Sequence, residues 1–472
     1  MKTLKLKSSA VITAAVLLSA CSIMPKLEQP QVAVPDTFKF DVPAQEAVQA
    51  ASLGWQDYFA DPRLHRLIEI ALQRNTDLRA AALNSEAVRK QYMISRAAEL
   101  PGINASGSGS RSGGIGSNNI PTSSSYRVGL GITGYELDLF GKAHSQSEAA
   151  LQNYFATAAA RDSAHLSLVA AVAKAYFNER YAEESMVLAE RVLKSRQQTY
   201  RLTQLKHKAG VVSAVDLRQQ EALIESAKSD YAKAAKGRET ARNALAMLLN
   251  RPIPDDLPNG LPLNKQFKIS RLPAGLTSEV LLNRPDIRAA EFALKQANAN
   301  IGAARAAFFP SISLTTTVGI GSNELGKLFS GSNAVWAFAP SINLPIFNWG
   351  SLQASLDAAE IRKQIQVVNY EGAVQAAFRD VSDALVARAQ LDHSHEAAVR
   401  QAKAYSETRR LVGLRYKHGV ASALALLDAE RSSYAADSAV LASSLSRLEN
   451  MADLYKALGG GLKRFTHEPA AQ

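Results

Sequence analysis

One set of sequence landmarks occurs twice in this chain, in the same order and at the same spacing. The segment DLRAA at 77–81 corresponds to DIRAA at 286–290. Near the end of each half, KAGVVSAVDL at 208–217 matches KHGVASALAL at 417–426. Landmarks kept in one order and at one spacing indicate a tandem duplication. The chain is therefore predicted to contain two copies of one structural unit.

The duplication sets the predicted domain boundaries. The stretch NRPIPDDLPNGLPLNKQFKISRLPAGL lies between the two halves, and its prolines are typical of a linker. The predicted segments are a signal peptide (1–20), a lipidated N-terminal segment (21–60), the first repeat (61–249), the linker (250–276), the second repeat (277–460) and a C-terminal tail (461–472).

Each copy is predicted to contain the same elements in the same order. A helix (61–99 or 277–308) is followed by a strand that begins at Pro101 or Pro310, and a loop rich in Gly, Ser and Asn leads to a second strand (126–140 or 334–347). A long helix follows. Residues 142–209 contain neither Gly nor Pro, which allows an uninterrupted helix of roughly 100 Å. The equivalent helix is predicted at 351–417, and each long helix is followed by a returning helix.

The four strands alternate between apolar residues and small polar ones. In the strand after Pro310, Ile312, Leu314 and Val318 alternate with Ser, Thr and Gly. Strands of about ten residues are long enough to cross a bilayer at a tilt, and an apolar outer face with a polar inner face is typical of transmembrane barrels. A soluble sandwich shows the same alternation. Loops rich in Gly, Ser and Asn at only one end favour the barrel.

Four strands are too few to close a barrel. No run of eighteen apolar residues follows residue 20, so strands rather than helices are predicted to cross the membrane. Open edges in lipid leave backbone groups without partners. Two chains would supply eight strands, whose interior side chains largely fill, whereas three chains would supply twelve strands around a lumen. A trimer is therefore predicted.

The N-terminus predicts export and lipidation. Lys2, Lys5 and Lys7 precede the apolar stretch AVITAAVLLSA, which is too short to span a bilayer and is typical of a secretory signal. The following LSAC resembles the lipobox of bacterial lipoproteins, in which Cys21 would be acylated. The alternative is an ordinary signal with an incidental cysteine. Ser22 after the cysteine fits outer-membrane sorting.

The basic charge does not indicate a nucleic-acid partner. The formal net charge is +11 and the pI is about 9.5. Basic residues are scattered among Glu and Asp, which is typical of solvated helix faces. An exported chain seldom meets nucleic acid, so no nucleic-acid binding is predicted.

Four motifs together resemble the outer membrane efflux proteins, the TolC-like family. They are GWQDYFADPRLHRLIEIALQRNTDL (54–78), YELDLFGK (135–142), LLNRPDIRAAE (281–291) and ARAAFFPSISL (304–314), and they are most similar to those of Mtr-type multidrug efflux channels. The resemblance implies a mixed α/β homotrimer with a twelve-stranded β-barrel that continues into a long periplasmic α-helical barrel. It also implies a passive, gated duct for drugs and amphiphiles, without enzymatic activity or a cofactor. The implied partners are outer-membrane lipid, a periplasmic adaptor and an inner-membrane RND transporter.

The resemblance also implies a periplasmic gate. Asp428 matches a gate aspartate, Leu424 a constricting apolar ring, and Arg415 and Tyr416 match residues that bond to a neighbouring helix, with Asp216 as the expected acceptor. A second acidic ring in close relatives corresponds to Ala425, which leaves the number of rings open. The alternative for each residue is a polar group on a solvated helix.

Gly210 and Gly419 are expected at the turns of two helical hairpins, where the resemblance places the contact with adaptor tips. A turn that requires a positive φ explains the same glycines without any partner.

Motifs for other functions lack their structural context. GLGITG at 129–134 fits a dinucleotide-binding pattern but lies inside a predicted strand. HSH at 393–395 has no further ligands nearby, so no metal site is predicted. Two alternative functions remain: an outer-membrane channel for type I protein secretion, and a coiled-coil lipoprotein scaffold that is not a channel.

Overall fold

The computed structural model describes most of the chain and divides it into two compact units. One unit contains residues 83–158 and 289–372, and the other contains 54–82, 159–288 and 373–460. Each unit therefore takes equivalent segments from both copies of the repeat. Cys21, the predicted signal peptide and the predicted tail lie outside the described residues, which are 23–28, 30, 32–35, 38, 54–115, 121–267, 281, 284–331 and 333–460.

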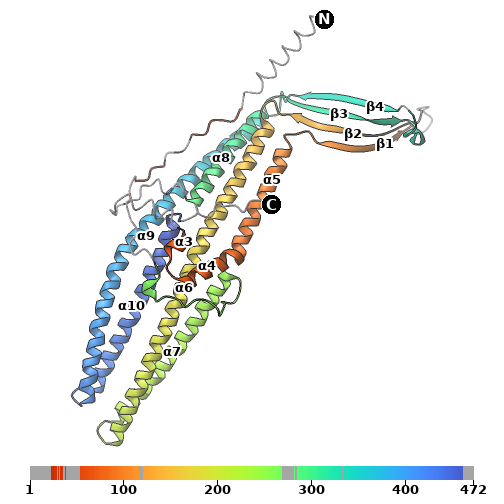
Figure 1. Ribbon diagram of the computed structural model, residues 1–472. Helices are drawn as coiled ribbons and strands as arrows, with labels where there is room; N and C mark the ends of the chain where they lie inside the picture. Colours follow the sequence, from red (N-terminus) through yellow and green to blue (C-terminus); the bar gives the residue numbers. More distant parts are fainter. Residues whose placement is uncertain are drawn as a thin grey trace. The chain divides into compact units, whose positions relative to one another are not determined.

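The first unit contains an antiparallel sheet of four strands in the order β1-β2-β3-β4 (Figure 1). The strands are β1 (Ile103–Ser112), β2 (Ser123–Leu137), β3 (Ser311–Ser322) and β4 (Ala334–Asn343). The central pairing, β2 with β3, joins the two copies of the repeat. Within the described chain, β1 and β4 are the edges of the sheet.

The two faces of the sheet differ as the alternation predicts. Val318 lies opposite Trp336, and both side chains are largely exposed on the apolar face. Ser313 lies opposite Ser341 on the other face, where their hydroxyl oxygens are 2.8 Å apart. A bulge at Gly134, whose φ is +65° and whose N–H donates to the Thr315 hydroxyl, keeps this alternation in register.

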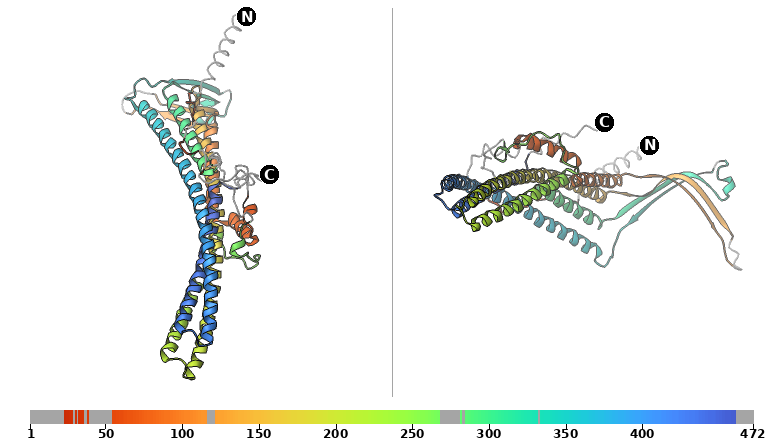
Figure 2. Two further views of the ribbon diagram at one scale, coloured as in Figure 1. Left: turned by 90° about the vertical axis from the view of Figure 1, so that its left-hand side faces the viewer. Right: turned by 90° about the horizontal axis from the view of Figure 1, so that it is seen from below.

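Long helices dominate both units, and most begin and end close to the predicted positions. They are α5 (Thr76–Ala97), α6 (Lys142–Lys208), α7 (Ala214–Leu249), α8 (Pro285–Ala306), α9 (Ser351–Lys417) and α10 (Ala423–Ala457). In the second unit, α6 with α7 and α9 with α10 form two helical hairpins whose tips lie at one end (Figures 1 and 2). Among the described residues, no helix is long and apolar enough to cross a membrane.

The predicted helix at 61–99 is two helices, and the prediction of one is wrong. The first helix, α4 (Pro62–Arg74), ends at Asn75, where α5 begins. The Asn75 side chain accepts hydrogen bonds from the N–H groups of Asp77 and Leu78, which caps α5, and it donates to the carbonyl of Leu248 on α7. A local Asn cap, fixed in addition by a distant helix, therefore marks the break, and no Gly or Pro lies there.

The main hydrophobic core lies in the second unit and joins helices from both copies. Trp55 and Tyr58 of the short helix α3 (Trp55–Tyr58) are buried, as are Phe177 of α6 and Tyr455 of α10. The Tyr58 and Tyr455 rings are 4.9 Å apart, and the Tyr58 hydroxyl donates to the carbonyl of Met451. The N-terminal part of this unit thus holds α6 and α10 together.

Asp61 is the polar centre of this core and is fully buried. Its carboxylate caps α4 by accepting from the N–H of Arg63, and it also accepts from the Tyr176 hydroxyl at 2.7 Å, the Leu261 N–H at 2.8 Å and the Gln266 amide at 3.1 Å. A buried carboxylate is tolerated when donors satisfy its oxygens. Asp61 therefore fastens α4 to α6 and to the segment that follows α7.

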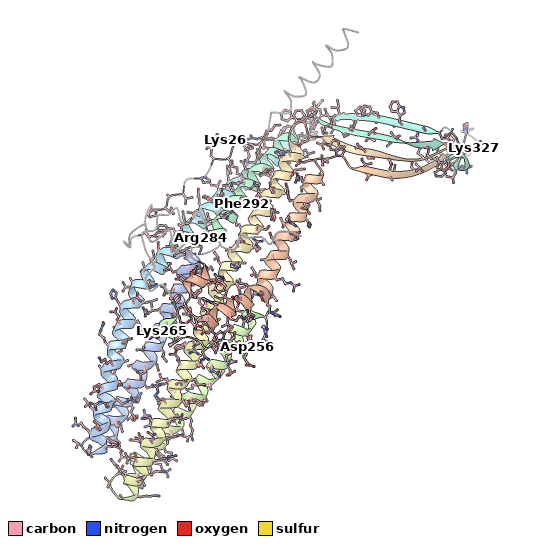
Figure 3. The ribbon with its side chains drawn as sticks, in the orientation of Figure 1. Lys26, Asp256, Lys265, Arg284, Phe292 and Lys327 are labelled. Atoms are coloured by element: carbon pink, nitrogen blue, oxygen red, sulfur yellow. The ribbon has the colours of Figure 1, made fainter. Side chains whose placement is uncertain are left out.

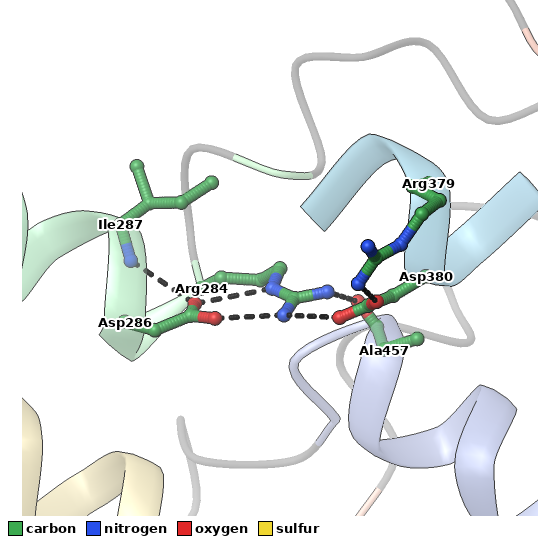
Figure 4. Close-up of polar contacts among 6 residues, drawn as sticks. All are labelled: Arg284, Asp286, Ile287, Arg379, Asp380 and Ala457. Carbon is green, nitrogen blue, oxygen red and sulfur yellow. Dashed lines mark hydrogen bonds and ion pairs between the residues drawn. The ribbon is translucent and has the colours of Figure 1, made fainter. Parts of the chain in front are cut away.

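A second buried polar group, Arg284, fastens the start of α8 (Figure 4). Its guanidinium donates to Asp286 at 2.7 Å, to Asp380 of α9 at 3.3 Å and to the carbonyl of Ala457 at the end of α10 at 2.9 Å. The arginine of the LLNRPDIRAAE motif thus joins three helices of the second copy. The ion pair between Arg284 and Asp286 explains why the motif contains an arginine and, two residues later, an aspartate.

We expect Asp61→Ala to destabilise the second unit by about 3 kcal/mol or more, because three buried donors lose a charged acceptor and α4 loses its cap. The measurement is the midpoint of thermal unfolding, followed by the helical circular dichroism of the detergent-solubilised protein. The control is Asp256→Ala, which removes an exposed carboxylate (Figure 3) and leaves the midpoint unchanged. Equal midpoints for both variants would contradict the central role of Asp61.

Candidate functional site

The tips of the two helical hairpins have the same backbone geometry. Gly210 and Gly419 have φ of +73° and +75°. After α6 the N–H of Val211 donates to the carbonyl of Lys206, and after α9 the N–H of Val420 donates to the carbonyl of Arg415, both at 2.8 Å. This is the Schellman pattern, which requires a left-handed residue at the end of the helix. The repeated glycine is therefore needed for the turn itself.

A serine starts the returning helix at each tip. The hydroxyl of Ser213 accepts from the N–H of Asp216, and Ser422 accepts from the N–H of Ala425 in the same way. The Asp216 carboxylate in turn accepts from the N–H and the hydroxyl of Ser213, which completes a capping box. At the first tip, Ser213 and Asp216 therefore cap each other's N–H groups. At the second tip, Ala425 has no side-chain acceptor, so only Ser422 provides a cap.

Apolar side chains are exposed at both tips. They are Val211 and Val215 after α6, and Val420 and Leu424 after α9, each with about two thirds of its surface exposed. Single exposed apolar residues are common, but two equivalent clusters on two duplicated turns form a surface that fits an apolar partner.

Tyr416 is buried near the tip and contacts α6. Its hydroxyl lies 3.3 Å from that of Thr203, its carbonyl accepts from the Lys206 ammonium at 3.2 Å, and this ammonium lies 4.2 Å from the centre of its ring. Arg415 is exposed. Within the described residues of one chain, neither side chain forms a bond with Asp216, which caps α7. Their pairing with Asp216 on a neighbouring helix stays a prediction.

Asp428 and Leu424 lie one turn apart on an exposed face of α10. Leu426 and Ala429 are buried on a different face of the same helix. The structure thus brings the two predicted gate residues together on a surface that is free in one chain. Ala425, also exposed, lies beside them.

The sequence analysis missed an ion pair that lies close to these residues. Arg196 of α6 and Glu430 of α10 form an ion pair, with side chains only 7% and 12% exposed. Burial raises the pKa of the Glu430 carboxyl, while Arg196 opposes this shift. Residues two apart on a helix point to nearly opposite sides. The pair therefore holds one side of α10 against α6 and leaves the side of Asp428 exposed.

Arg196, Thr203 and Lys206 form a row along one face of α6. Their spacings of seven and three residues correspond to about two turns and one turn. All three contact the second hairpin, through Glu430 or Tyr416. No local motif signals this row, because the partners lie more than 200 residues away in the sequence.

The described residues contain no cluster of three His, Cys, Asp or Glu side chains that could hold a metal ion. His395 of the HSH segment instead lies 2.8 Å from the hydroxyl of Ser443, which joins α9 to α10. The candidate site therefore consists of the exposed surfaces of the two hairpin tips and of the hydrogen bonds and ion pairs that join their helices.

Comparison with known proteins identifies close relatives. The profile of the family described as "Outer membrane efflux protein" matches residues 67–251 and 276–460. The probable efflux pump outer membrane protein TtgC of Pseudomonas putida is 42% identical over 456 residues, which cover 95% of this chain and 94% of TtgC. The cation efflux system protein CusC of Escherichia coli K12 is also 42% identical, over 95% of this chain and 98% of CusC.

The fold matches that of a solved channel. The crystal structure of the open state of the Neisseria gonorrhoeae MtrE outer membrane channel superimposes with a TM-score of 0.88. The two sequences are 63% identical, and the match covers 94% of this chain and 99% of MtrE.

We expect Arg196→Met to loosen the second hairpin, because Glu430 then stays buried without its partner, at a cost of about 3 kcal/mol. Hydrogen exchange at the α9–α10 tip is the measurement, and faster exchange is the expected result. The double variant Arg196→Met with Glu430→Met should exchange more slowly than the single variant, since no charge is then buried.

Lys194→Met is the matched control for this pair. Lys194 lies two residues before Arg196 on the same helix and forms an exposed ion pair with Glu190. Its loss should leave hydrogen exchange unchanged. Equal exchange in the Arg196 and Lys194 variants would show that the buried pair does not hold the hairpin.

Proposed function

Because the chain belongs to the outer membrane efflux protein family, we propose that it is the outer-membrane channel of a multidrug efflux pump. It is a passive, gated duct through which drugs and other amphiphiles cross the periplasm and the outer membrane. The chain does no chemistry itself, and an inner-membrane transporter of the RND type supplies the energy.

The observation that carries this proposal is the four-stranded sheet with one apolar face and two edges. In lipid the unpaired N–H and C=O groups of β1 and β4 need partners, because no water reaches them. A second copy offers the complementary edge, and three copies close a ring of twelve strands around a lumen lined by the polar face. The proposed assembly is therefore a homotrimer.

Apolar helix faces support the same assembly. Leu83 and Ile94 are exposed on α5, which leads into β1, and Ile361 and Val368 are exposed on α9, which follows β4. These faces belong to helices at opposite edges of the sheet. A head-to-tail contact between copies covers both faces and pairs β4 of one copy with β1 of the next.

The tips of the helical hairpins are the proposed gate. Three Asp428 carboxylates, one from each copy, form an acidic ring, and three Leu424 side chains form an apolar constriction beside it. Their exposure on one face of α10 supports this role. Arg415 and Tyr416 hold the gate closed by bonding to a neighbouring helix, with Asp216 as the acceptor, and Ala425 leaves the gate with one acidic ring.

Two further contacts complete the proposed pump. A periplasmic adaptor docks on the turns at Gly210 and Gly419, where the exposed valines and Leu424 offer an apolar surface. Acyl chains on Cys21 anchor each copy in the outer membrane, as the LSAC motif predicts.

The native mass of the detergent-solubilised protein tests the assembly. We expect three times the mass of one chain, because fewer copies either leave strand edges open or fill the lumen. Replacing Ile94 by Asp on the apolar face of α5 should weaken the trimer. A uniform monomer of the unmodified protein would contradict the channel.

Single-channel conductance in planar bilayers tests the gate. Asp428→Ala combined with Arg415→Ala should raise the conductance and admit bulky antibiotics, because the acidic ring and one interhelical bond are lost. The double variant should also lower the preference of the channel for cations. Ala425→Asp should raise this preference, because it adds a second acidic ring.

Glu221→Gln is the control for the gate, since it removes an exposed carboxylate on α7 that pairs with Arg218. This variant should conduct like the unmodified channel. Unchanged conductance in the double variant would exclude Asp428 and Arg415 from the gate.

A further inference from the structure

The four strands contain three charged residues, and the register of the sheet assigns each to a face. They are Arg111, Arg127 and Glu136. Arg111 lies opposite Ser124 and therefore shares the apolar face of the sheet, at its end. Arg127 lies between Ser108 of β1 and Gly321 of β3, on the polar face.

Side-chain positions confirm the face of Arg127. A Cβ placed on Gly321 would lie 3.6 Å from Cγ of Arg127 and 3.4 Å from a methyl carbon of Val335. The Arg127 side chain therefore extends over a glycine of the neighbouring strand. The next row on this face contains Ser106, Gly129, Gly319 and Val335. Val335 belongs to β4, two strands away from Arg127, so the residues of this row that lie nearest to Arg127 are Ser and Gly.

Arg127 is the charge on the polar face that is left without a partner in the described part of the chain. Glu136 forms an ion pair with Lys142 at 3.1 Å, at the end of β2 that leads toward α6. In the connection between β3 and β4, Lys327 pairs with Glu324 at 2.9 Å. Arg127 itself is exposed, and no carboxylate among the described residues lies within ion-pair distance of it.

Arg127 lies toward the end of the sheet that is far from the helices of its unit. It pairs with Gly321, the second-last residue of β3, just before the connection that contains Lys327. Figure 3 shows Lys327 at this far end of the strands. In the proposed trimer this is the external section of the lumen.

We propose that Arg127 is a selectivity-determining residue of the channel and that it favours amphiphiles that carry a carboxylate, sulfonate or phosphate group. This inference rests on the proposed function, since it needs the polar face to line a lumen. Three copies place three guanidinium groups around one level of a lining that is mostly Gly, Ser and Thr. Rings of Arg or Lys are a means by which pores select anions.

The effect depends on ionic strength. Exposed charges act over about 10 Å at 0.1 M salt and over about 3 Å at 1 M salt. The ring therefore raises the local concentration of anionic solutes at low salt and binds them too weakly to retain them. Metal cations and cationic solutes gain nothing from this ring, which separates its preference from that of the acidic gate.

The reversal potential of the reconstituted channel under a potassium chloride gradient tests the proposal. The recordings use the Asp428→Asn background, so that the acidic ring does not contribute. We expect Arg127→Gln to lower the ratio of chloride to potassium permeability by roughly twofold or more at ~20 mM salt, with little change near ~1 M. Arg127→Lys should retain the ratio, because it keeps the charge.

Arg111→Gln is the matched control, since it removes the same charge at the same end of the sheet but from the apolar face. It should leave the ratio unchanged, while native mass shows that each variant is trimeric. An unchanged ratio in Arg127→Gln, or an equal shift in Arg111→Gln, overturns the proposal and leaves the channel intact. Absence of conductance from the unmodified trimer overturns the proposed function as well.

Discussion

The free edges of β1 and β4 are the constraint on which the rest of the molecule depends. In lipid, each unpaired N–H or C=O group costs several kcal/mol, so an open four-stranded sheet is not stable there. The chain already solves this problem once, because β2 of the first copy pairs with β3 of the second. Pairing of β4 with β1 of the next chain repeats that contact between molecules. The internal duplication and the assembly of identical chains thus meet the same requirement, which is that every strand edge finds a partner. The requirement is met when the barrel closes.

Buried polar groups hold the helices of the second unit in a single arrangement. Asp61 joins the N-terminal helices to α6, Arg284 joins α8 to α9 and α10, and Arg196 joins α6 to α10. Apolar packing alone tolerates small slides of one helix along another, whereas a buried charge is stable in one register only, since a slide leaves it without its partner. Long helices have many equivalent registers, so this specificity matters most for α6 and α9. The positions of the two hairpin tips depend on this register.

The sequence predicted the elements well and their contacts poorly. The bounds of α6 followed from the lack of Gly and Pro within it and from the glycine just beyond its end, which are local signals. Those of α9, which contains Gly372 and Gly413, followed from its equivalent place in the second copy and from Gly419 just beyond its end. The break at Asn75 was missed although Asn is a common N-cap residue, and only its hydrogen bond to the carbonyl of Leu248, far away in the chain, lay beyond the reach of the sequence. The Arg196–Glu430 pair was missed because its two residues are far apart in the sequence. The capping box of Ser213 and Asp216 was within reach of the sequence, since Ser-x-x-Asp at a helix start is its local signature, and it assigns Asp216 a structural role beside the predicted one.

A duct that serves many solutes has to attract each of them weakly. Strong binding at any level would hold one solute and block the others, so most of the polar face is Gly, Ser and Thr, and charge occurs at few positions. The two exposed charges proposed to act on solutes, Asp428 and Arg127, have opposite signs and lie in different units of the chain. A solute with both charges meets an attractive group at each, whereas a solute with one charge is favoured at one level and disfavoured at the other. In the proposed channel, selection is then a product of two weak steps, and a single substitution shifts the preference without closing the path.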